Sequence, residues 1–182
     1  MEPWRLFHCS TAPLFQCSSV LYTVDGPDTP SGGHPQPLRE TSVVTCFLLR
    51  TDPEGVDEVL ILRRSGRVRT YKGRWAAVSG YLEGEPEEQA RREIREETGL
   101  ADADVELLRA GEPFTFDDPE LDTRWTVHPF LFRVHPGGAI AIDWEHTEAR
   151  WVRPGNLGRY RTVPRLKEAL DRVYPTTQGA IQ

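Results

Sequence analysis

Long apolar runs are absent from this sequence of 182 residues. None approaches the ~20 residues that a membrane-spanning helix needs, and the segment 1–19 lacks the basic start and unbroken apolar stretch of a secretory signal. The net charge of −6 leaves no excess of positive charge for general binding to nucleic acid. We therefore expect a cytoplasmic protein that acts without a membrane and without nucleic acid.

Cysteine is also scarce. Cys9, Cys17 and Cys46 are odd in number and widely spaced, so a disulfide framework is not expected. His8 lies beside the first of them and suggests zinc, but a fourth ligand is missing. The cysteines therefore indicate neither a disulfide scaffold nor a zinc site.

The length fits one domain with tails. Residues 1–38 show no clear hydrophobic period, and residues 25–37 are rich in Pro, Gly, Ser and Thr, which is typical of a linker. We expect an N-terminal extension ending in this linker, a folded domain over 39–176, and a frayed C-terminus over 177–182.

The N-terminal extension carries a few features of its own. Residues 19–24 could form a short strand. Trp4, Phe7 and Phe15 could dock on the domain or on a second subunit, in which case the protein would be a homodimer. A disordered tail is the alternative.

Carboxylates are what the sequence has in abundance, and three of them crowd the stretch Arg92–Leu100. At about 100° per residue, Glu93, Glu96 and Glu97 fall within roughly 100° of arc on one helix face. Like charges at this spacing destabilise a helix by about 0.2–0.5 kcal/mol per pair. A hard cation bound among the carboxylates would turn this repulsion into a net attraction. Oxygen ligands suit Mg²⁺ or Mn²⁺, and Mg²⁺ commonly bridges protein carboxylates to phosphates. The stretch predicts metal-assisted attack on a phosphate chain; the alternative is a solvated helix face laced with arginines.

The stretch Arg92–Leu100 resembles the second half of the Nudix box. Its order is Arg-Glu, an aliphatic residue, one variable residue, Glu-Glu, one variable residue, then glycine and an aliphatic residue. Residues 75–80 lie upstream, where that family has its strand and glycine turn. Gly80 is followed by four residues before Glu85, where the family has five, and that glutamate by six before the arginine, where the family has seven. Either Glu83 or Glu85 could take the place of the family's first glutamate.

The resemblance covers about residues 41–174 and implies an α/β fold, a Nudix-type α/β/α sandwich with a mixed β-sheet. It also implies hydrolysis, dependent on Mg²⁺ or Mn²⁺, of a diphosphate linkage in a nucleoside diphosphate joined to another group, such as a nucleotide sugar or ADP-ribose. The metal ligands that it implies are Gly80, Glu93, Glu96, Glu97 and Glu145.

The catalytic roles are carried over in the same way. Residues 145–152 are similar to a late segment of several Nudix enzymes, in which a loop glutamate often reaches the metals as ligand or base. Glu145 takes that role, with Glu148 as second choice. The general base is then Glu93 or Glu145, and Arg92 orients a neighbouring carboxylate by a charge-assisted hydrogen bond.

A basic segment precedes Trp75, which we expect in the core. The basic residues that we expect to bind the phosphates are Arg64, Arg67, Lys72 and Arg74. An ordinary solvated loop is the alternative. An acidic loop over 117–122 could cover the site or be solvated.

Hydrophobic periodicity places the remaining elements. Strands are expected over 42–49, 59–62, 105–116 and 123–134, and helices from Pro86 to Gly99 and over 163–174. Trp125, His128 and Phe130 are interpreted as one strand face, which either packs in the sheet or forms a base-stacking platform.

Other functions stay open. A Nudix-like module that senses or binds a nucleotide without cleaving it is the main alternative, although its usual sign, loss of a helix glutamate, is absent. An isomerase of isoprenoid diphosphates would need an active-site context that Cys46 lacks. Among substrates, nucleotide sugars, ADP-ribose, nucleoside triphosphates and dinucleoside polyphosphates are not separated by the sequence.

Overall fold

The structure, a computed structural model, describes residues 37–174. The expected strand over 19–24, the docking role of the N-terminal aromatic residues, the candidate zinc ligands and the frayed end over 177–182 all lie outside these residues. Among the described residues, no helix has the length and apolar character needed to cross a bilayer.

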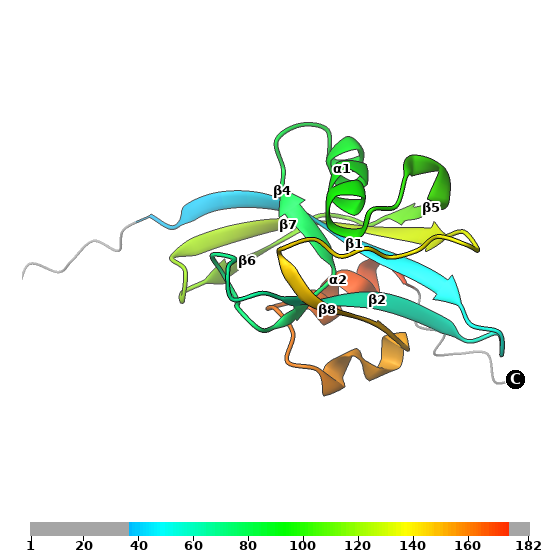
Figure 1. Ribbon diagram of the computed structural model, residues 1–182. Helices are drawn as coiled ribbons and strands as arrows, with labels where there is room; N and C mark the ends of the chain where they lie inside the picture. The colour runs from blue at the N-terminus through cyan, green and yellow to red at the C-terminus, as the bar shows by residue number, and fades with distance from the viewer. Residues whose placement is uncertain (1–36, 175–182) are drawn as a thin grey trace, which may run out of the picture. The chain divides into compact units, whose positions relative to one another are not determined.

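Eight strands and two α-helices make up the described fold (Figure 1). The strands are β1 (Arg39–Thr51), β2 (Asp57–Arg64), β3 (Trp75–Ala76), β4 (Val78–Tyr81), β5 (Val105–Ala110), β6 (Phe114–Asp118), β7 (Thr123–Val134) and β8 (His146–Val152). The helices are α1 (Pro86–Thr98) and α2 (Leu166–Val173), with short 3₁₀ turns η1 (Asp102–Asp104) and η2 (Pro154–Arg159).

Strand β1 is the centre of a mixed sheet. It pairs in parallel with β7 and antiparallel with both β2 and β4. Strands β5 and β6 extend the sheet from β7, and β3 and β8 extend it from β2. Because β4 has β1 as its one strand partner in the described fold, its other edge is available to border a cleft.

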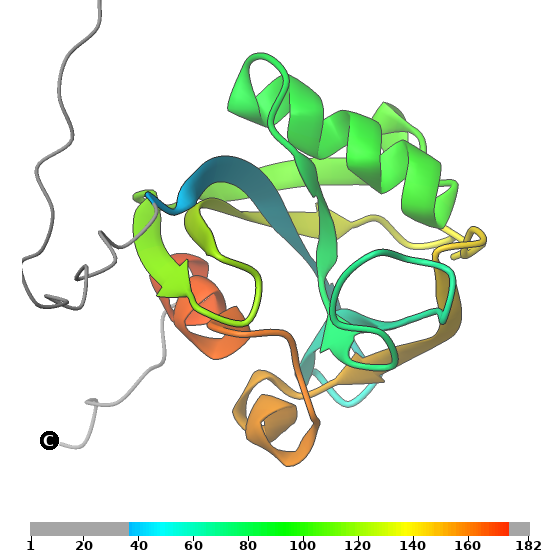
Figure 2. The same cartoon turned by 90° about the vertical axis from the view of Figure 1, so that its left-hand side faces the viewer.

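The two faces of the sheet carry different helices, because successive side chains of a strand point to opposite faces. Val44 and Leu48 of β1 pack in a cluster with Ile94 of α1. Phe47 of the same strand packs in a second cluster with Leu170 of α2. Figure 2 shows α1 and α2 on opposite sides of the sheet. The expected α/β/α sandwich with a mixed sheet is therefore confirmed.

The expected strand over 105–116 is two strands, β5 and β6, both paired with β7. Pro113 supplies no N–H to a sheet ladder. A Cβ on Gly111 would lie 2.8 Å from Cγ1 of Val173, so the chain there passes too close to α2 for a side chain. The expected helix over 163–174 is also shorter, since it begins at Leu166 after Pro164.

The grouping of Trp125, His128 and Phe130 on one face of β7 is wrong. Trp125 shares its face with Val127, whereas Phe130 lies in the cluster beneath α1. The physical reason is the two-residue period of a strand, which separates odd from even positions. The prediction that Trp75 is a core residue is confirmed, since it is 8% exposed.

Candidate functional site

A cleft of about 430 Å³ lies beside β4 and α1. Carboxylates line one part of it, from Glu83, Glu93, Glu96 and Glu145. Aromatic and aliphatic side chains line another part, from Tyr71, Tyr81, Phe116, Trp125 and Val127. The cleft therefore suits a ligand that combines a charged part, held through a cation, with a flat apolar part.

Helix α1 is a rigid carrier for the glutamates. It begins at Pro86, whose missing N–H costs nothing in the first turn, and ends at Gly99 in the left-handed conformation with φ 72°. The Gly99 N–H donates to the Arg95 carbonyl at 3.0 Å. Ala90 and Ile94 are buried against the sheet. This packing fixes the adjacent flank of the helix, which carries the glutamates, at the edge of the contact and toward the cleft.

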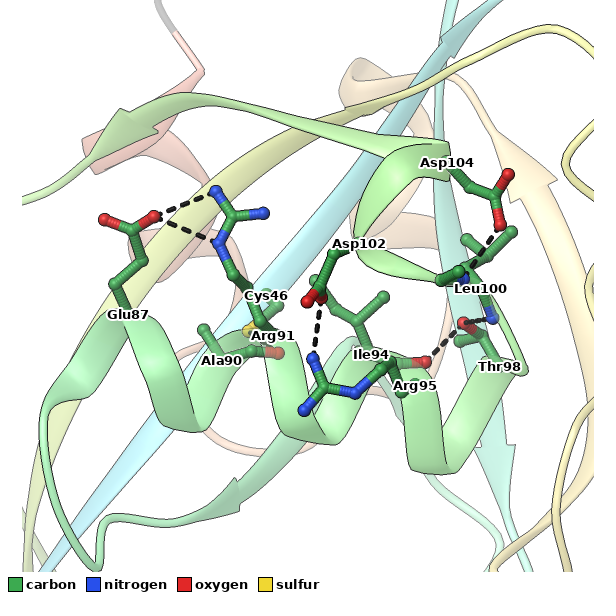
Figure 3. Close-up of polar contacts among 11 residues, drawn as sticks. Cys46, Glu87, Ala90, Arg91, Ile94, Arg95, Thr98, Leu100, Asp102 and Asp104 are labelled. Atoms are coloured by element: carbon green, nitrogen blue, oxygen red, sulfur yellow. Dashed lines mark hydrogen bonds and ion pairs between the residues drawn. The ribbon is translucent and has the colours of Figure 1, made fainter.

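Two arginines of α1, Arg91 and Arg95, make ion pairs with residues that do not line the cleft (Figure 3), whereas Arg92 pairs with Glu83 in the cleft wall. The pairs are Arg91 with Glu87 at 2.9 Å, Arg95 with Asp102 at 2.6 Å, and Arg92 with Glu83 at 3.8 Å. Within residues 37–174, no ion pair joins these arginines to Glu93, Glu96 or Glu97. The interpretation of this stretch as an arginine-laced, solvated face is therefore not favoured.

Glu97 is the most deeply placed of the three, with 4% of its surface exposed. Its Oε1 accepts the backbone N–H of Ser79 at 3.1 Å. Its Oε2 is buried and has no hydrogen-bond partner. Burial raises the pKa of Glu97 well above its usual value; the Ser79 hydrogen bond opposes this rise, and the charges of Glu93 and Glu145 add to it. A buried carboxylate oxygen without a partner is costly unless a cation or proton compensates it.

His146 lies behind this carboxylate, with its Nε2 3.6 Å from Glu97 Oε2. Its Nδ1 lies 3.2 Å from Oδ1 of Asp143, which also accepts the backbone N–H of Glu145 at 3.0 Å. Burial lowers the pKa of His146, against the opposing effect of Asp143. The sequence analysis placed His146 within the late segment 145–152 but gave no role to it or to Asp143.

Glu93 lies directly against Gly80 of β4. A Cβ on Gly80 would fall 2.0 Å from the Glu93 carboxylate carbon, so any side chain at this position would force that carboxylate to move. Gln89 Nε2 donates to Glu93 Oε1 at 2.6 Å. Burial raises the pKa of Glu93, and the charges of Glu96 and Glu145 add to this effect.

Gly80, Glu93, Glu96 and Glu145 line the one cleft, so the structure brings together four of the five expected metal ligands. The fifth, Glu97, is buried beside them. Burial and then the charge of Asp143 raise the pKa of Glu145. As the side chains stand, no three His, Cys, Asp or Glu groups in the described part of the chain are close enough to hold a metal ion. A cation would therefore have to draw these carboxylates inward.

The two candidates for the family's first glutamate are placed differently. Glu83 lines the cleft, and its carboxylate lies 3.8 Å from Arg92. Glu85 is the residue that precedes the first turn of α1, and its side chain makes no capping hydrogen bond. The position of Glu83 beside Arg92 favours it for that role.

Of the four basic residues expected at the phosphates, Arg64 lines the cleft. Its Nε donates to the Thr70 carbonyl at 3.1 Å, which closes the loop on itself. The other three are not among the residues that line the cleft. Arg67 lies over the Trp144 ring at 5.0 Å, Lys72 is exposed, and Arg74 lies at 5.6 Å over the ring of Tyr71, which does line the cleft.

The acidic segment 117–122 is not simply solvated. Asp118 is 5% exposed and accepts a hydrogen bond from the Tyr71 hydroxyl. Tyr71 lines the cleft and has a left-handed backbone with φ 52°, which is uncommon for an aromatic residue. The two loops are thus joined beside the site, a contact that no local sequence pattern indicates.

Comparison with protein families finds the NUDIX domain model over residues 39–175. A comparison with curated protein sequences finds no match. Solved structures that resemble this one include the Nudix hydrolase RenU from M. smegmatis, with 20% identity, a TM-score of 0.60, and coverage of 71% of this chain and 80% of that one.

Two further structures were determined with bound ligands or as complexes. The C. elegans Ap4A hydrolase binary complex has 18% identity and a TM-score of 0.60, covering 72% of this chain and 93% of that one. The NUDIX domain of Shewanella oneidensis NrtR in complex with ADP ribose has 14% identity and a TM-score of 0.57, covering 78% of this chain and 92% of that one. At these identities the likeness establishes the fold.

Proposed function

Because this chain belongs to the Nudix family, we propose that it is a divalent-metal-dependent pyrophosphohydrolase that cleaves a diphosphate linkage in a nucleoside diphosphate derivative. The observation that carries the proposal is the buried Oε2 of Glu97, which has no hydrogen-bond partner and lies beside a cleft lined by four further carboxylates.

The donor set fits a hard cation. Glu93, Glu96, Glu97 and Glu145 offer carboxylate oxygens, and the Gly80 carbonyl adds a neutral one. Mg²⁺ and Mn²⁺ prefer such oxygen ligands. Burial is the main cause of the raised pKa of Glu93 and Glu145, and repulsion from neighbouring carboxylates adds to it; a cation among them would relieve that repulsion.

When bound, such a cation would neutralise phosphate oxygens and lower the pKa of a water molecule. Side chains of the protein would then accept a proton, bind the phosphates and position one another. Glu93 or Glu145 takes the proton of the attacking water, since both line the cleft and burial raises the pKa of each above its usual value, which makes each a stronger base. Arg64 holds the phosphates through charge, while Arg92 holds Glu83 in place.

The nucleotide part of the proposal is supported by the apolar half of the cleft and by the ligands named for two similar folds. Ap4A and ADP-ribose share an adenosine joined to phosphates. A nucleotide sugar or ADP-ribose combines such a nucleoside with a diphosphate and therefore fits a cleft with one charged and one aromatic part.

The test is a hydrolysis screen of the full chain in which the products are separated by chromatography. Cleavage of the diphosphate link in a nucleotide sugar or ADP-ribose yields a nucleoside monophosphate and a sugar phosphate, and no free phosphate. The screen would compare nucleotide sugars, ADP-ribose, nucleoside triphosphates and dinucleoside polyphosphates with Mg²⁺, with Mn²⁺ and with a chelator. We expect metal-dependent turnover with diphosphate-linked nucleotides and none with the chelator. Absence of turnover across the panel, together with metal-dependent nucleotide binding, would instead favour the alternative, a non-catalytic nucleotide-binding module.

A further inference from the structure

Two large hydrophobic side chains are exposed among residues 37–174, and they are placed differently. Tyr81 is 51% exposed and Trp144 is 54% exposed. Tyr81 lines the cleft, whereas Trp144 does not and instead carries the Arg67 guanidinium over its ring at 5.0 Å. An exposed aromatic ring at the wall of a cleft is a candidate contact for a ligand.

The Tyr81 ring is supported from behind. It stacks on Trp125, with the ring centroids 6.3 Å apart and the planes 26° from parallel. Trp125 itself is only 6% exposed. The backbone holds the pair in register, because Tyr81 pairs with Val43 of β1 and Trp125 pairs with Thr41 of the same strand. Tyr81 is thus a flat ring with one face supported and half its surface open to solvent.

The ring lies one residue from the carboxylates. Gly80 contacts Glu93 on the α1 side of β4, and the next residue, Tyr81, points to the other side because strand side chains alternate. Ring and carboxylate therefore lie on opposite faces of β4, next to its open edge, and both line the same cleft. A ligand that passes this edge can place an aromatic base against the ring and its phosphates near the carboxylates.

We propose that Tyr81, supported by Trp125, is the platform on which the nucleobase of the substrate stacks, so that Tyr81 is a specificity-determining residue for an aromatic base. The inference rests on the proposed function, since the base is attached to the diphosphate that is cleaved. Stacking needs only a flat π-face and not a particular edge of the base. The platform therefore selects for an aromatic ring and tolerates different bases.

The test separates the base from the phosphates. The dissociation constants of ADP and of inorganic pyrophosphate would be measured by calorimetry with Mg²⁺ for the full-length wild type, Tyr81→Ala, Tyr81→Phe and Trp144→Ala. We expect Tyr81→Ala to weaken ADP binding about tenfold and to leave pyrophosphate binding unchanged. Tyr81→Phe keeps the ring, so its dissociation constant for ADP should stay within about threefold of the wild-type value. Trp144→Ala changes the matched exposed aromatic residue outside the cleft, and its dissociation constant for ADP should also stay within about threefold of the wild-type value.

Two results would overturn the platform while leaving the proposed function intact. One is equal ADP affinity in Tyr81→Ala and wild type. The other is an equal loss for ADP and pyrophosphate, which would place the effect at the phosphates or in the fold. Thermal unfolding of each variant checks the fold, and Tyr81→Leu serves in place of an alanine variant that unfolds. A wild type that binds neither probe and cleaves no nucleotide would reject the proposed function itself.

Discussion

Gly80 and Glu93 are in such close contact that a Cβ on the glycine would lie 2.0 Å from the glutamate carboxylate carbon. The contact joins the edge strand β4 to the helix that carries the other candidate ligands. Gly80 has no left-handed φ, so its backbone would accept alanine without strain. The absence of a side chain is thus required by the Glu93 carboxylate and not by the turn.

The first prediction follows from that contact. Gly80→Ala should displace the Glu93 carboxylate and lower turnover about a hundredfold, since a displacement of about 1 Å at a catalytic group can have that effect. The unfolding midpoint should change little. Gly84→Ala is the matched control, because a Cβ there would meet nothing within 4 Å. Equal turnover in the two variants would contradict the placement of Glu93 in the site.

A second prediction concerns Glu97. Glu97→Gln should lower turnover roughly a hundredfold or more, because the amide cannot serve as an anionic ligand. In metal-free buffer the variant should be at least as stable as wild type, since a buried carboxylate with a raised pKa has been replaced by a neutral group. Glu88→Gln, on the exposed flank of the same helix, is the control. Kinetic assays measure the change in turnover, and thermal unfolding measures the change in stability. Wild-type turnover in Glu97→Gln would show that this residue has no part in the mechanism.

The third prediction separates the basic residues that the sequence could not rank. Arg64→Ala should raise the Michaelis constant about tenfold and lower turnover less, because Arg64 lines the cleft and binds phosphate in the ground state as well. Arg67→Ala should change the Michaelis constant little, since that guanidinium lies over Trp144 outside the cleft. A larger effect for Arg67 than for Arg64 would show that the loop moves when substrate binds.

The parts of the site on α1 were predictable because they are local. Pro86 and Gly99 are the start and stop signals of one helix, and the spacing of Glu93, Glu96 and Glu97 is a property of that helix alone. The mixed sheet followed from the family resemblance. Its central strand pairs with β7, more than 80 positions away in the chain, and no short-range pattern encodes such a partner.

What could not be predicted depends on contacts between distant segments. Tyr71 reaches Asp118 across 47 positions, and His146 meets Glu97 across a similar interval. Tyr81 is a platform only because β1 holds it in register with Trp125. The grouping of side chains on β7 failed for a simpler reason, since counting along the strand would have separated Trp125 from Phe130.

A fourth prediction concerns stability at mildly acidic pH. Burial lowers the pKa of His128 below its usual value of 6.5. Below pH 6.5 the His128 imidazole is protonated more readily in the unfolded chain than in the native protein, which favours unfolding. The contribution of His128 to stability is therefore present above pH 6.5 and is lost as the pH falls. His128→Gln should therefore lose less stability than wild type between pH 7 and about pH 5. Urea unfolding of both proteins at each pH measures the difference, and parallel curves would exclude this role.

The last prediction tests the junction between Tyr71 and Asp118. Tyr71→Phe removes the hydroxyl that donates to a carboxylate with 5% exposure, and an unsatisfied buried group costs about 1–3 kcal/mol. Tyr174→Phe is a matched control, since that hydroxyl donates at 3.0 Å to Asp57, which is partly exposed and can bond to water instead. Chemical unfolding should therefore show a larger loss for Tyr71→Phe than for Tyr174→Phe. Equal losses would mean that Asp118 finds another partner when Tyr71 is changed, and that the two loops beside the cleft are held together by other contacts.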